Sequence, residues 1–310
     1  MEHGEPLVTT GPRQRVDALR LVAAALTLLT LITIAGIILF LIRGSIEVFR
    51  HEGWAFFSRN HWYYRKSAYQ AAAMLYGTAV VSSIAILLAT PLAFATAVVS
   101  SEMLSERPRL ALKLLIELLA GVPSVIYGLL GVLFLRNRMS ALFLRLRWDA
   151  DSGDTLLTAG VLLAIMILPT LMTLLDDAFR SVPARHRDAA RGLGLTRAET
   201  LRSVIIPQSM PGILSAVLLA LGRAVGETIA VFLVVGRADN RLPQLGAIAH
   251  SLVDAGQTIT SKLGGAETNI AVGDPLHTSA LLALALTLFV AVIGITLMAS
   301  ALRTRMEPVA

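Results

Sequence analysis

The sequence contains no cysteine, so it has no disulfide bond, no thiolate nucleophile and no metal site with sulfur ligands. Its six histidines include no His-x-x-His or His-Glu-x-x-His pair, which argues against a metal site. A Gly-x-x-x-x-Gly-Lys-Ser/Thr loop for nucleotide phosphates is also missing. These absences predict a protein that carries no metal, no cofactor and no bound nucleotide of its own.

Charge is scarce as well. Only 15% of the 310 residues are charged and 55% are hydrophobic, whereas a soluble domain has about 25% charged residues. The mean hydropathy is +0.70. Six apolar segments exceed the length of roughly 18 residues that indicates a membrane-spanning helix: Leu21–Ile42, Met74–Val99, Leu114–Leu135, Leu156–Leu175, Gly212–Gly236 and Leu276–Ala301. The sequence therefore predicts an all-α polytopic membrane protein with six transmembrane helices and no sizeable soluble domain.

We expect the first apolar segment to remain in the protein as an anchor. It is longer than the 7–15-residue apolar region of a signal peptide, and Arg43 follows it without an Ala-x-Ala-like cleavage site. The next segment holds clustered aromatic residues, which predict an anchoring belt at the membrane surface. The resulting division is a cytoplasmic N-terminal segment (1–20), the first helix (21–42), an outer amphipathic segment (43–73), a core with the other five helices and the loop 176–211 (74–301), and a cytoplasmic tail (302–310).

An even number of spans places both chain ends on the same side of the membrane. If that side is the cytoplasm, the inner segments carry slightly more Lys and Arg than the outer ones, which favours this orientation weakly. The high isoelectric point, about 10.1, comes from basic residues spread over every loop without interleaved aromatics. Such residues flank membrane lipid, and a nucleic-acid partner is not expected.

Proline residues interrupt three of the predicted spans: Pro91, Pro123 and Pro169 lie within the second, third and fourth. Each removes a backbone hydrogen bond and bends its helix. Broken helices at membrane depth are tolerated where the freed carbonyl groups face other protein or a cavity. Bent helices around a passage fit transport better than a passive anchor.

Two charged residues, Arg223 and Glu227, lie in the middle of the fifth apolar segment. Four residues apart on a continuous helix, they would project from one face. A charge near the bilayer midplane costs roughly 2.5–3.5 kcal/mol, so such residues are rare and usually functional. Arg offers a planar fork that can bind two oxygens of an anion, and Glu one turn away can neutralise it in an empty site. The pair predicts an anion site within the membrane.

A structural role for this pair stays open. Gly222 and Gly226 form a Gly-x-x-x-Gly pattern, which often marks close packing between transmembrane helices. Arg223 and Glu227 could then be an ion pair at the interface with a partner permease.

Three further residues are weaker candidates for the same passage. Glu117, near the cytoplasmic end of its span, is either a partner for Arg223 or a carboxylate at the membrane surface. Ser124 and Thr228 could line a polar passage together with Tyr127, although a Ser or Thr hydroxyl also bonds readily to its own helix backbone.

The loop 176–211 carries a second signal. Ser181-Val182-Pro183 predicts the start of a short helix, which the turn Gly192-Leu193-Gly194 ends. Thr196, with Glu199 three residues later, predicts a capping box at the start of a second helix. The expected structure is a compact helix–turn–helix on the cytoplasmic surface, and an ordinary loop with exposed arginines is the alternative.

The spacing within this loop resembles the EAA loop of ABC importer permeases. That pattern is Glu-Ala-Ala, three residues, Gly, nine residues, Ile, any residue and Leu-Pro; Asp, Val and Ile replace Glu, Ile and Leu here. The resemblance implies the type I ABC importer permease fold and a coupling helix that docks on a separate ATP-hydrolysing subunit. It assigns the coupling to Asp188, Ala189, Ala190, Gly194, Val204, Ile206 and Pro207.

Two other stretches, 116–128 and 222–231, resemble the third- and fifth-helix signatures of phosphate-specific permeases, and 257–261 resembles their C-type subunit. The resemblance implies a bacterial cytoplasmic-membrane importer of phosphate. Its other parts would be an A-type permease subunit, a dimer of ATP-binding subunits and a periplasmic phosphate-binding protein. In that family, Arg223 and Glu227 match charged residues implicated in translocation.

Other functions remain possible at this point. Within the importer class, the alternative cargo is another tetrahedral oxyanion, sulfate or molybdate. A secondary anion transporter driven by ions would also use an intramembrane Arg–Glu pair, and a scaffold that docks an ATPase would also use the loop. The secondary transporter leaves the EAA-like loop unexplained.

Overall fold

In the computed structural model, residues 12–306 are described except 149, 151 and 243–247. The predicted cytoplasmic ends therefore fall partly outside the described residues, at 1–11 and 307–310. Within the described chain, six helical stretches are long and apolar enough to cross a membrane, which confirms the predicted all-α polytopic fold. They are Leu19–Glu52, Ala72–Met103, Ser124–Leu146, Leu156–Arg180, Arg197–Gly226 and Pro275–Leu302.

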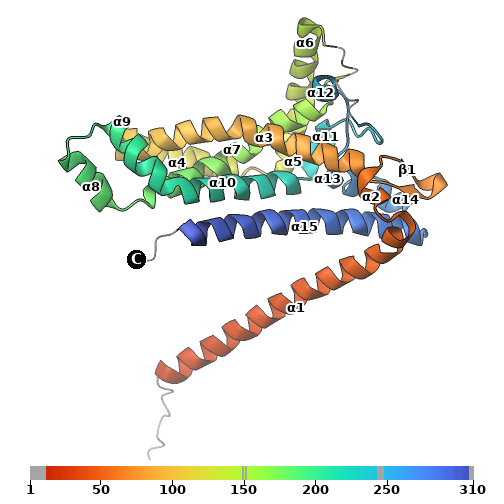
Figure 1. Cartoon of the computed structure of the whole chain (residues 1–310), viewed down its shortest axis with the longest axis horizontal. Coiled ribbons are helices and arrows are strands. Elements are labelled where there is room, and N and C mark those ends of the chain that lie inside the picture. Colours follow the sequence, from red (N-terminus) through yellow and green to blue (C-terminus); the bar gives the residue numbers. More distant parts are fainter. Residues whose placement is uncertain (1–11, 149, 151, 243–247, 307–310) are drawn as a thin grey trace, which may run out of the picture.

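Most of the long helices lie side by side along one axis (Figure 1). In chain order the elements are α1 (Pro12–Glu52), α2 (Ala55–Ser58), β1 (Trp62–Tyr63), the 3-10 turn η1 (Tyr64–Lys66), β2 (Ala68–Tyr69), α3 (Ala72–Val98), the π-turn η2 (Val99–Met103), α4 (Glu106–Ala120), α5 (Ser124–Leu130), the π-turn η3 (Gly131–Leu135), α6 (Arg136–Leu146), α7 (Leu156–Arg180), α8 (Ala184–Gly192), α9 (Arg197–Thr200), the π-turn η4 (Leu201–Ile205), α10 (Ile206–Gly226), α11 (Ile229–Val234), α12 (Ile248–Ser251), α13 (Ile259–Leu263), α14 (Glu267–Ile270) and α15 (Pro275–Met306).

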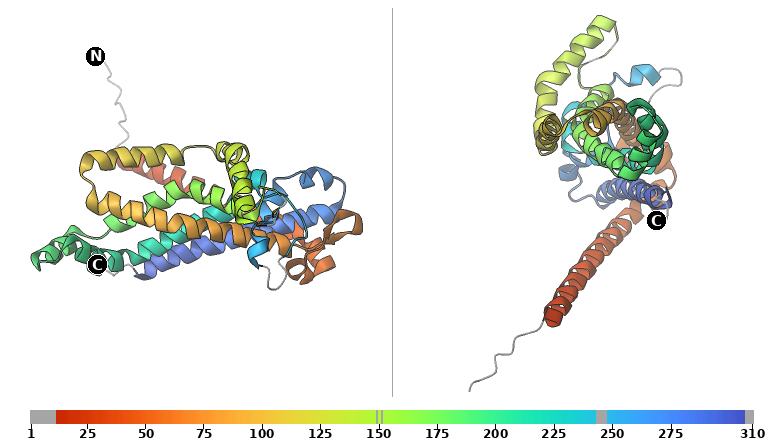
Figure 2. Two further views of the ribbon diagram at one scale, coloured as in Figure 1. Left: turned by 90° about the horizontal axis from the view of Figure 1, so that it is seen from above. Right: turned by 90° about the vertical axis from the view of Figure 1, so that its left-hand side faces the viewer.

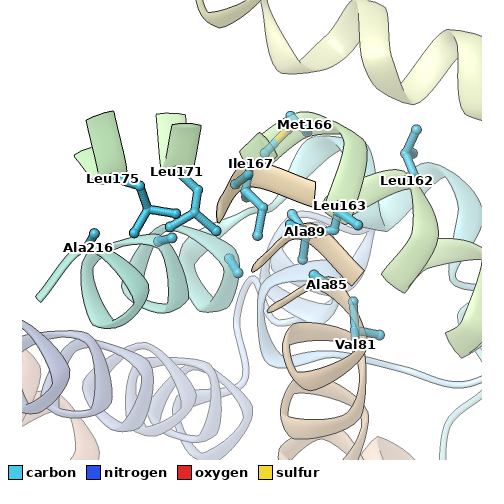
Figure 3. Close-up of a cluster of buried hydrophobic side chains, with 14 of the residues drawn as sticks. Val81, Ala85, Ala89, Leu162, Leu163, Met166, Ile167, Leu171, Leu175 and Ala216 are labelled. Carbon is cyan, nitrogen blue, oxygen red and sulfur yellow. The ribbon is translucent and has the colours of Figure 1, made fainter. Parts of the chain in front are cut away.

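The centre of the bundle is the contact between α3 and α7. On α3 a small residue recurs every fourth position, so one face is a buried stripe of alanines that lets the two backbones approach closely. Large aliphatic side chains of α7 cover this stripe, and α10 closes the cluster through Ala216 (Figure 3). The stripe is Ala85, Ala89, Ala93 and Ala97, with Val81 one turn before it, and the covering residues include Leu163, Ile167, Leu171 and Leu175.

The third predicted span is wrong in extent. Instead of one helix over 114–135, α4 ends at Ala120 and α5 begins at Ser124, with Pro123 between them in an extended conformation. Because proline has no backbone N–H and disfavours helix in the residue before it, the chain breaks here rather than bending. The crossing segment is Ser124–Leu146, which runs through α5, η3 and α6.

The fifth predicted span is also two helices. It starts earlier than predicted, at Arg197, and α10 ends at Gly226. Glu227 is extended (φ −71°, ψ 126°), and α11 starts at Ile229. The break falls at glycine, which has the weakest helix preference of any residue except proline.

The two ends of the bundle differ. The α8–α9 hairpin lies at one end, and both described ends of the chain lie toward that same end (Figures 1 and 2). The small elements α2, β1 and α14 lie at the opposite end. The hairpin therefore lies at the same end of the bundle as the start of α1 and the end of α15.

The outer segment 43–73 is not a single amphipathic stretch at the membrane surface. Its first part continues α1 to Glu52, and the rest folds into α2 and a two-residue antiparallel hairpin that pairs Trp62 with Tyr69. Trp54 is exposed, but Phe56, Trp62 and Tyr69 are buried in a small core with the start of α15. The prediction of an anchoring belt is wrong for these three aromatics, because they pack against the protein.

Helix α1 meets the bundle only near its outer end and diverges from it toward the opposite end (Figures 1 and 2). At the contact, Ser279 of α15 accepts a hydrogen bond from the Val48 backbone N–H at 3.0 Å. Along the most apolar window of α1, no residue is buried within the chain. This helix thus presents a long apolar face to lipid or to another subunit.

Candidate translocation and coupling sites

The two helix breaks lie next to each other inside the bundle. Helix α5 packs directly on α11, because Gly128 has no side chain: a Cβ there would lie 2.6 Å from Leu233 Cδ1 and 3.1 Å from Ala230 Cα. Gly128 is one turn from the start of α5, and Ala230 is the second residue of α11. Two helix N-termini, each with free backbone N–H groups and partial positive charge, therefore begin side by side.

Arg223 lies in the last turn of α10, directly before the second break. Its side chain is exposed, and within the described chain no carboxylate forms an ion pair with it. It is close enough to the Tyr127 hydroxyl of α5 to interact with it electrostatically. A cation in a last turn also stabilises the helix through the dipole. Arg223 is thus an accessible positive charge beside the two helix N-termini.

Glu227 does not pair with Arg223, so the predicted ion pair on one helix face is wrong. The helix ends at Gly226, and the extended backbone at Glu227 turns its side chain toward α11. There its Oε1 accepts a hydrogen bond from the Ala230 backbone N–H at 3.3 Å. The carboxylate, half-buried, caps the N-terminus of α11.

Tyr127 connects the two parts of the other broken helix. Its hydroxyl donates to the Leu119 carbonyl oxygen at 2.9 Å, in the last turn of α4, where this oxygen also accepts the Val122 N–H. Ser124 is the first residue of α5 and is partly exposed. Thr228 precedes α11, and its hydroxyl donates only a long bond, 3.4 Å, to the Gly226 carbonyl oxygen. Both hydroxyls thus lie at the starts of the two neighbouring helices.

Glu117 pairs with a lysine of its own helix and not with Arg223. It is on α4, its side chain is 54% exposed, and its carboxylate lies 3.9 Å from Lys113 Nζ one turn earlier. No ion pair joins it to Arg223 in the described chain, as the alternative of a carboxylate at the membrane surface predicts.

Only one glycine of the Gly-x-x-x-Gly pattern packs against another helix of the described chain. A Cβ at Gly222 would lie 3.7 Å from Ile295 Cγ2 of α15, an ordinary packing distance. A Cβ at Gly226 would meet no atom of the described chain within 4 Å. The pattern therefore does not hold α10 against another helix of the same chain through both glycines.

The loop between the fourth and fifth spans has the predicted helix–turn–helix. Helix α8 ends in a turn in which Gly194 adopts φ +80°, and the Leu195 N–H donates to the Ala190 carbonyl oxygen at 3.2 Å. Thr196 and Glu199 form the predicted capping box. The second helix continues through η4 into α10, so Val204 and Ile206 lie on one continuous helix that enters the membrane.

Exposure divides the residues of the EAA-like pattern into two groups. Ala190 is 3% exposed, because it packs inside the hairpin, whereas Asp188 and Ala189 point outward. Leu193, between the two glycines of the turn, is 82% exposed. The sequence analysis did not single out this leucine, although an apolar residue at the tip of a polar loop is a recognisable signal. The outward face of the hairpin includes Asp188, Ala189 and Leu193.

Arg187 joins the hairpin to the membrane helices, which the sequence analysis also missed. Its guanidinium forms an ion pair with Glu102 of η2 and donates to the Phe179 carbonyl oxygen at the end of α7, at 2.6 Å. Both charged side chains are largely buried. Because Glu102 is 85 residues away in the sequence, no local pattern reveals this contact.

Residues 89–308 match the family described as binding-protein-dependent transport system inner membrane component. The chain belongs to this family. It is 36% identical over 280 residues to the phosphate transport system permease protein PstC of Mesorhizobium japonicum, which covers 86% of this chain and 83% of that one. It is also 33% identical to PstC of Haemophilus influenzae, over 92% and 91% of the two chains.

Solved structures agree on the fold. The inward-facing MetNI methionine ABC transporter superposes with a TM-score of 0.54 at 13% identity, covering 76% of this chain and 96% of that chain. The predicted type I ABC importer permease fold is confirmed. As a binding-protein-dependent inner-membrane component, the chain is a transport subunit rather than an enzyme, and it works with a separate substrate-binding protein and an ATPase.

Removing the Arg187 guanidinium should loosen α8. Arg187→Met loses two charge-assisted bonds, each worth about 1.5–3 kcal/mol, so the amides of α8 should exchange with deuterium at least about a hundredfold faster. The exposed Arg185 on the same helix provides the matched control, Arg185→Met. Unchanged exchange in Arg187→Met would show that the contact does not hold the hairpin.

Proposed function

We propose that this chain is the C-type permease subunit of an ATP-driven phosphate importer. The observation that carries the proposal is Arg223, an accessible cation without a carboxylate partner, beside two helix N-termini inside the bundle. Fixed positive charge at such depth suits an anion, not a neutral or cationic cargo. The names of the similar PstC permeases support phosphate as that anion.

The site divides the work among its residues. Arg223 would bind two oxygens of phosphate, and the free N–H groups at the starts of α5 and α11 would bind others, with the Ser124 and Thr228 hydroxyls beside them. Glu227 carries negative charge at the edge of the same region. A carboxylate there accepts a hydrogen bond from the O–H group of a protonated phosphate but repels a fully ionised anion. It also limits how tightly the anion is held, which favours release.

A second permease would complete the passage. Arg223 and Glu227 are incompletely covered by this chain alone, and α1 diverges with an apolar face uncovered over most of its length. We assign this face to an A-type permease partner and surrounding lipid. The pair would form one translocation pathway between them by alternating access.

The hairpin α8–α9 would transmit the ATPase cycle. Asp188, Ala189 and Leu193 form the outward face for the ATP-binding dimer, and Gly194 provides the left-handed turn. Val204, Ile206 and Pro207 lie where the second helix passes into α10, so hairpin movement reaches Arg223 along one helix. Since the ATPase is cytoplasmic, both chain ends, which lie toward the hairpin, are cytoplasmic as well.

Replacing Arg223 tests the anion site. In the assembled complex, Arg223→Met should lower uptake of labelled phosphate by about a hundredfold, because charge-assisted bonds worth about 1.5–3 kcal/mol each are lost. Arg223→Lys should give an intermediate rate, since it keeps the charge without the fork. The exposed Arg145 of α6 gives the control Arg145→Met. Uptake retained in Arg223→Met would mean that the arginine has a structural role only.

Competition by other oxyanions tests selectivity. Excess sulfate or molybdate should not compete with labelled phosphate in the wild-type complex, because both are dianions without a proton to donate to Glu227. In a Glu227→Gln complex, competition should increase. The binding protein is the same in both complexes, so a difference reports on the permease. Equal competition in both would exclude Glu227 from selectivity, and strong competition in wild type would favour sulfate or molybdate as cargo.

Ala189 tests the docking face without disturbing the hairpin. Ala189→Arg should abolish ATP-driven uptake and weaken recovery of the ATPase with the permease, because a large cation replaces a small exposed side chain at the contact. Ala184→Arg, at an exposed position on another face of α8, should do neither. Ala190 is unsuitable because it is buried in the hairpin. Normal transport by Ala189→Arg would refute the docking assignment.

A further inference from the structure

A buried polar segment, Gly256–Gly264, lies against the outer side of the candidate translocation site. Its backbone rests directly on α3: a Cβ at Gly77 would overlap the Gln257 carbonyl oxygen. The Ile259 N–H donates to Thr78 Oγ1 at 3.0 Å. At the other end of the segment, a Cβ at Gly264 would lie 2.9 Å from Thr228 Cγ2. The segment thus spans from α3 to the start of α11, where Thr228 stands.

Most side chains of this segment are polar although they are buried; the two apolar ones, Ile259 and Leu263, pack in the small core beside α15. Each of Gln257, Thr258, Thr260 and Ser261 is less than one-tenth exposed. They bond mainly to one another: Ser261 Oγ lies 3.1 Å from Gln257 Oε1, and the Thr258 and Thr260 hydroxyls are 3.1 Å apart. Because these polar groups bond to one another, they keep their hydrogen-bond partners if the segment moves into water.

One buried lysine holds this segment to the outer loops. Lys262 is 2% exposed, and its Nζ lies 2.7 Å from Asp239 Oδ2 and 2.7 Å from Glu267 Oε1. It also lies over the Trp62 ring, 5.3 Å from the centroid. Its partners come from the loop after α11, from α14 and from the hairpin that follows α1. Three separate outer segments therefore meet on one ammonium group.

A second layer surrounds this contact. Glu267 Oε2 lies 2.7 Å from His277 Nε2 at the start of α15, and the buried His277 ring stacks on Tyr69 at 5.0 Å. Polar atoms of the layer remain without a partner in the described chain: Trp62 Nε1, His277 Nδ1 and Asp239 Oδ1. Because these atoms lack hydrogen-bond partners, the network stabilises this arrangement of the outer segments less than a fully bonded network would.

We propose that Gly256–Gly264 is a plug that closes the outer side of the translocation pathway, and that Lys262 is the positioning residue that latches it. The assignment of the pathway rests on the proposed function; the plug and latch do not depend on which anion passes. Opening toward the outside would separate Lys262 from Asp239 and Glu267 and let the polar segment leave α3 and Thr228.

The chemistry of the latch suits a reversible contact better than a permanent one. Desolvation offsets most of the attraction in a buried ion pair, and apolar residues of similar size usually hold a core at least as well. Charged partners differ from apolar ones because their bonds depend strongly on distance and direction. The ammonium group of Lys262 therefore loses its bonds once the loops shift. The neighbouring carboxylates are partly exposed, so water can replace the lysine as they separate.

The absence of cysteine in the chain allows a direct test of the plug. We place one reporter, Thr260→Cys, in the plug and measure labelling of this chain by a membrane-impermeant maleimide in the assembled complex in vesicles. Labelling should be slow at rest. It should rise at least about tenfold when binding protein and trapped nucleotide hold the complex open outward. No rise in the trapped complex would overturn the plug.

Weakening the latch should have the same effect without nucleotide. Lys262→Met should speed labelling of the reporter and raise ATP hydrolysis in the absence of binding protein. The exposed Lys66 of the same outer region gives the matched control, Lys66→Met. Gly77→Ala should also speed labelling, because its new methyl group pushes the plug from α3 without touching a charge.

Two milder variants keep the test decisive if Lys262→Met does not assemble. Asp239→Asn and Glu267→Gln each leave Lys262 one carboxylate and should speed labelling to a smaller degree. If every latch variant that assembles is labelled as slowly as the resting wild-type complex with the same reporter, the latch is refuted. These outcomes are independent of Arg223: a plug that moves while Arg223→Met still transports phosphate would refute the anion site and leave the plug standing.

Discussion

A backbone N–H or carbonyl group that leaves a helix inside a bilayer has no water to bond, and this constraint organises the molecule. In the described chain, two such breaks lie between neighbouring helices of the bundle, at 121–123 and 227–228. Each break is sheltered by the other helix and repaired by a specific side chain. Tyr127 donates to a carbonyl in the last turn of α4, and Glu227 accepts the Ala230 N–H in the first turn of α11. The polar site is the place where these two repairs meet.

Close packing makes this sheltering possible. The alanine stripe of α3 brings α7 near, and Gly128 brings α5 onto α11, so the gap left by each broken helix is filled with protein rather than lipid. Small residues thus do in the membrane what large apolar ones do in a soluble core: they bring backbones close and gain dispersion contacts. Arg223 remains accessible because no other part of the described chain packs against Gly226, which follows it in the last turn of α10.

The sequence predicted what depends on local pattern. Apolar length located six spans, and the Thr196–Glu199 capping box and the Gly194 turn were placed correctly because their signals lie within a few residues. Prediction from the sequence failed where the residues stay apolar although the backbone leaves the helix. Nothing between Gly212 and Gly236 marks the end of a helix except Gly226, and glycine occurs inside many transmembrane helices. The same-face argument for Arg223 and Glu227 therefore failed with the continuous helix it assumed.

Contacts between distant segments were beyond the sequence for a different reason. Lys262 meets Asp239, Glu267 and Trp62, and Arg187 meets Glu102, only because the fold brings loops together. The aromatic residues before α3 suggested a membrane surface, because Trp and Tyr are frequent there. In the folded chain, Trp62 and Tyr69 cover a buried histidine instead.

The contact between α1 and α15 has a consequence for biosynthesis. Val48 and Ser279 are 231 residues apart, so α1 is synthesised long before its partner α15. Until α15 is made, α1 must cross the membrane without that support, and its uncovered apolar surface lets it do so. The contact that holds α1 at its outer end can therefore form only after α15 has entered the membrane. The rest of α1 stays uncovered within the finished chain.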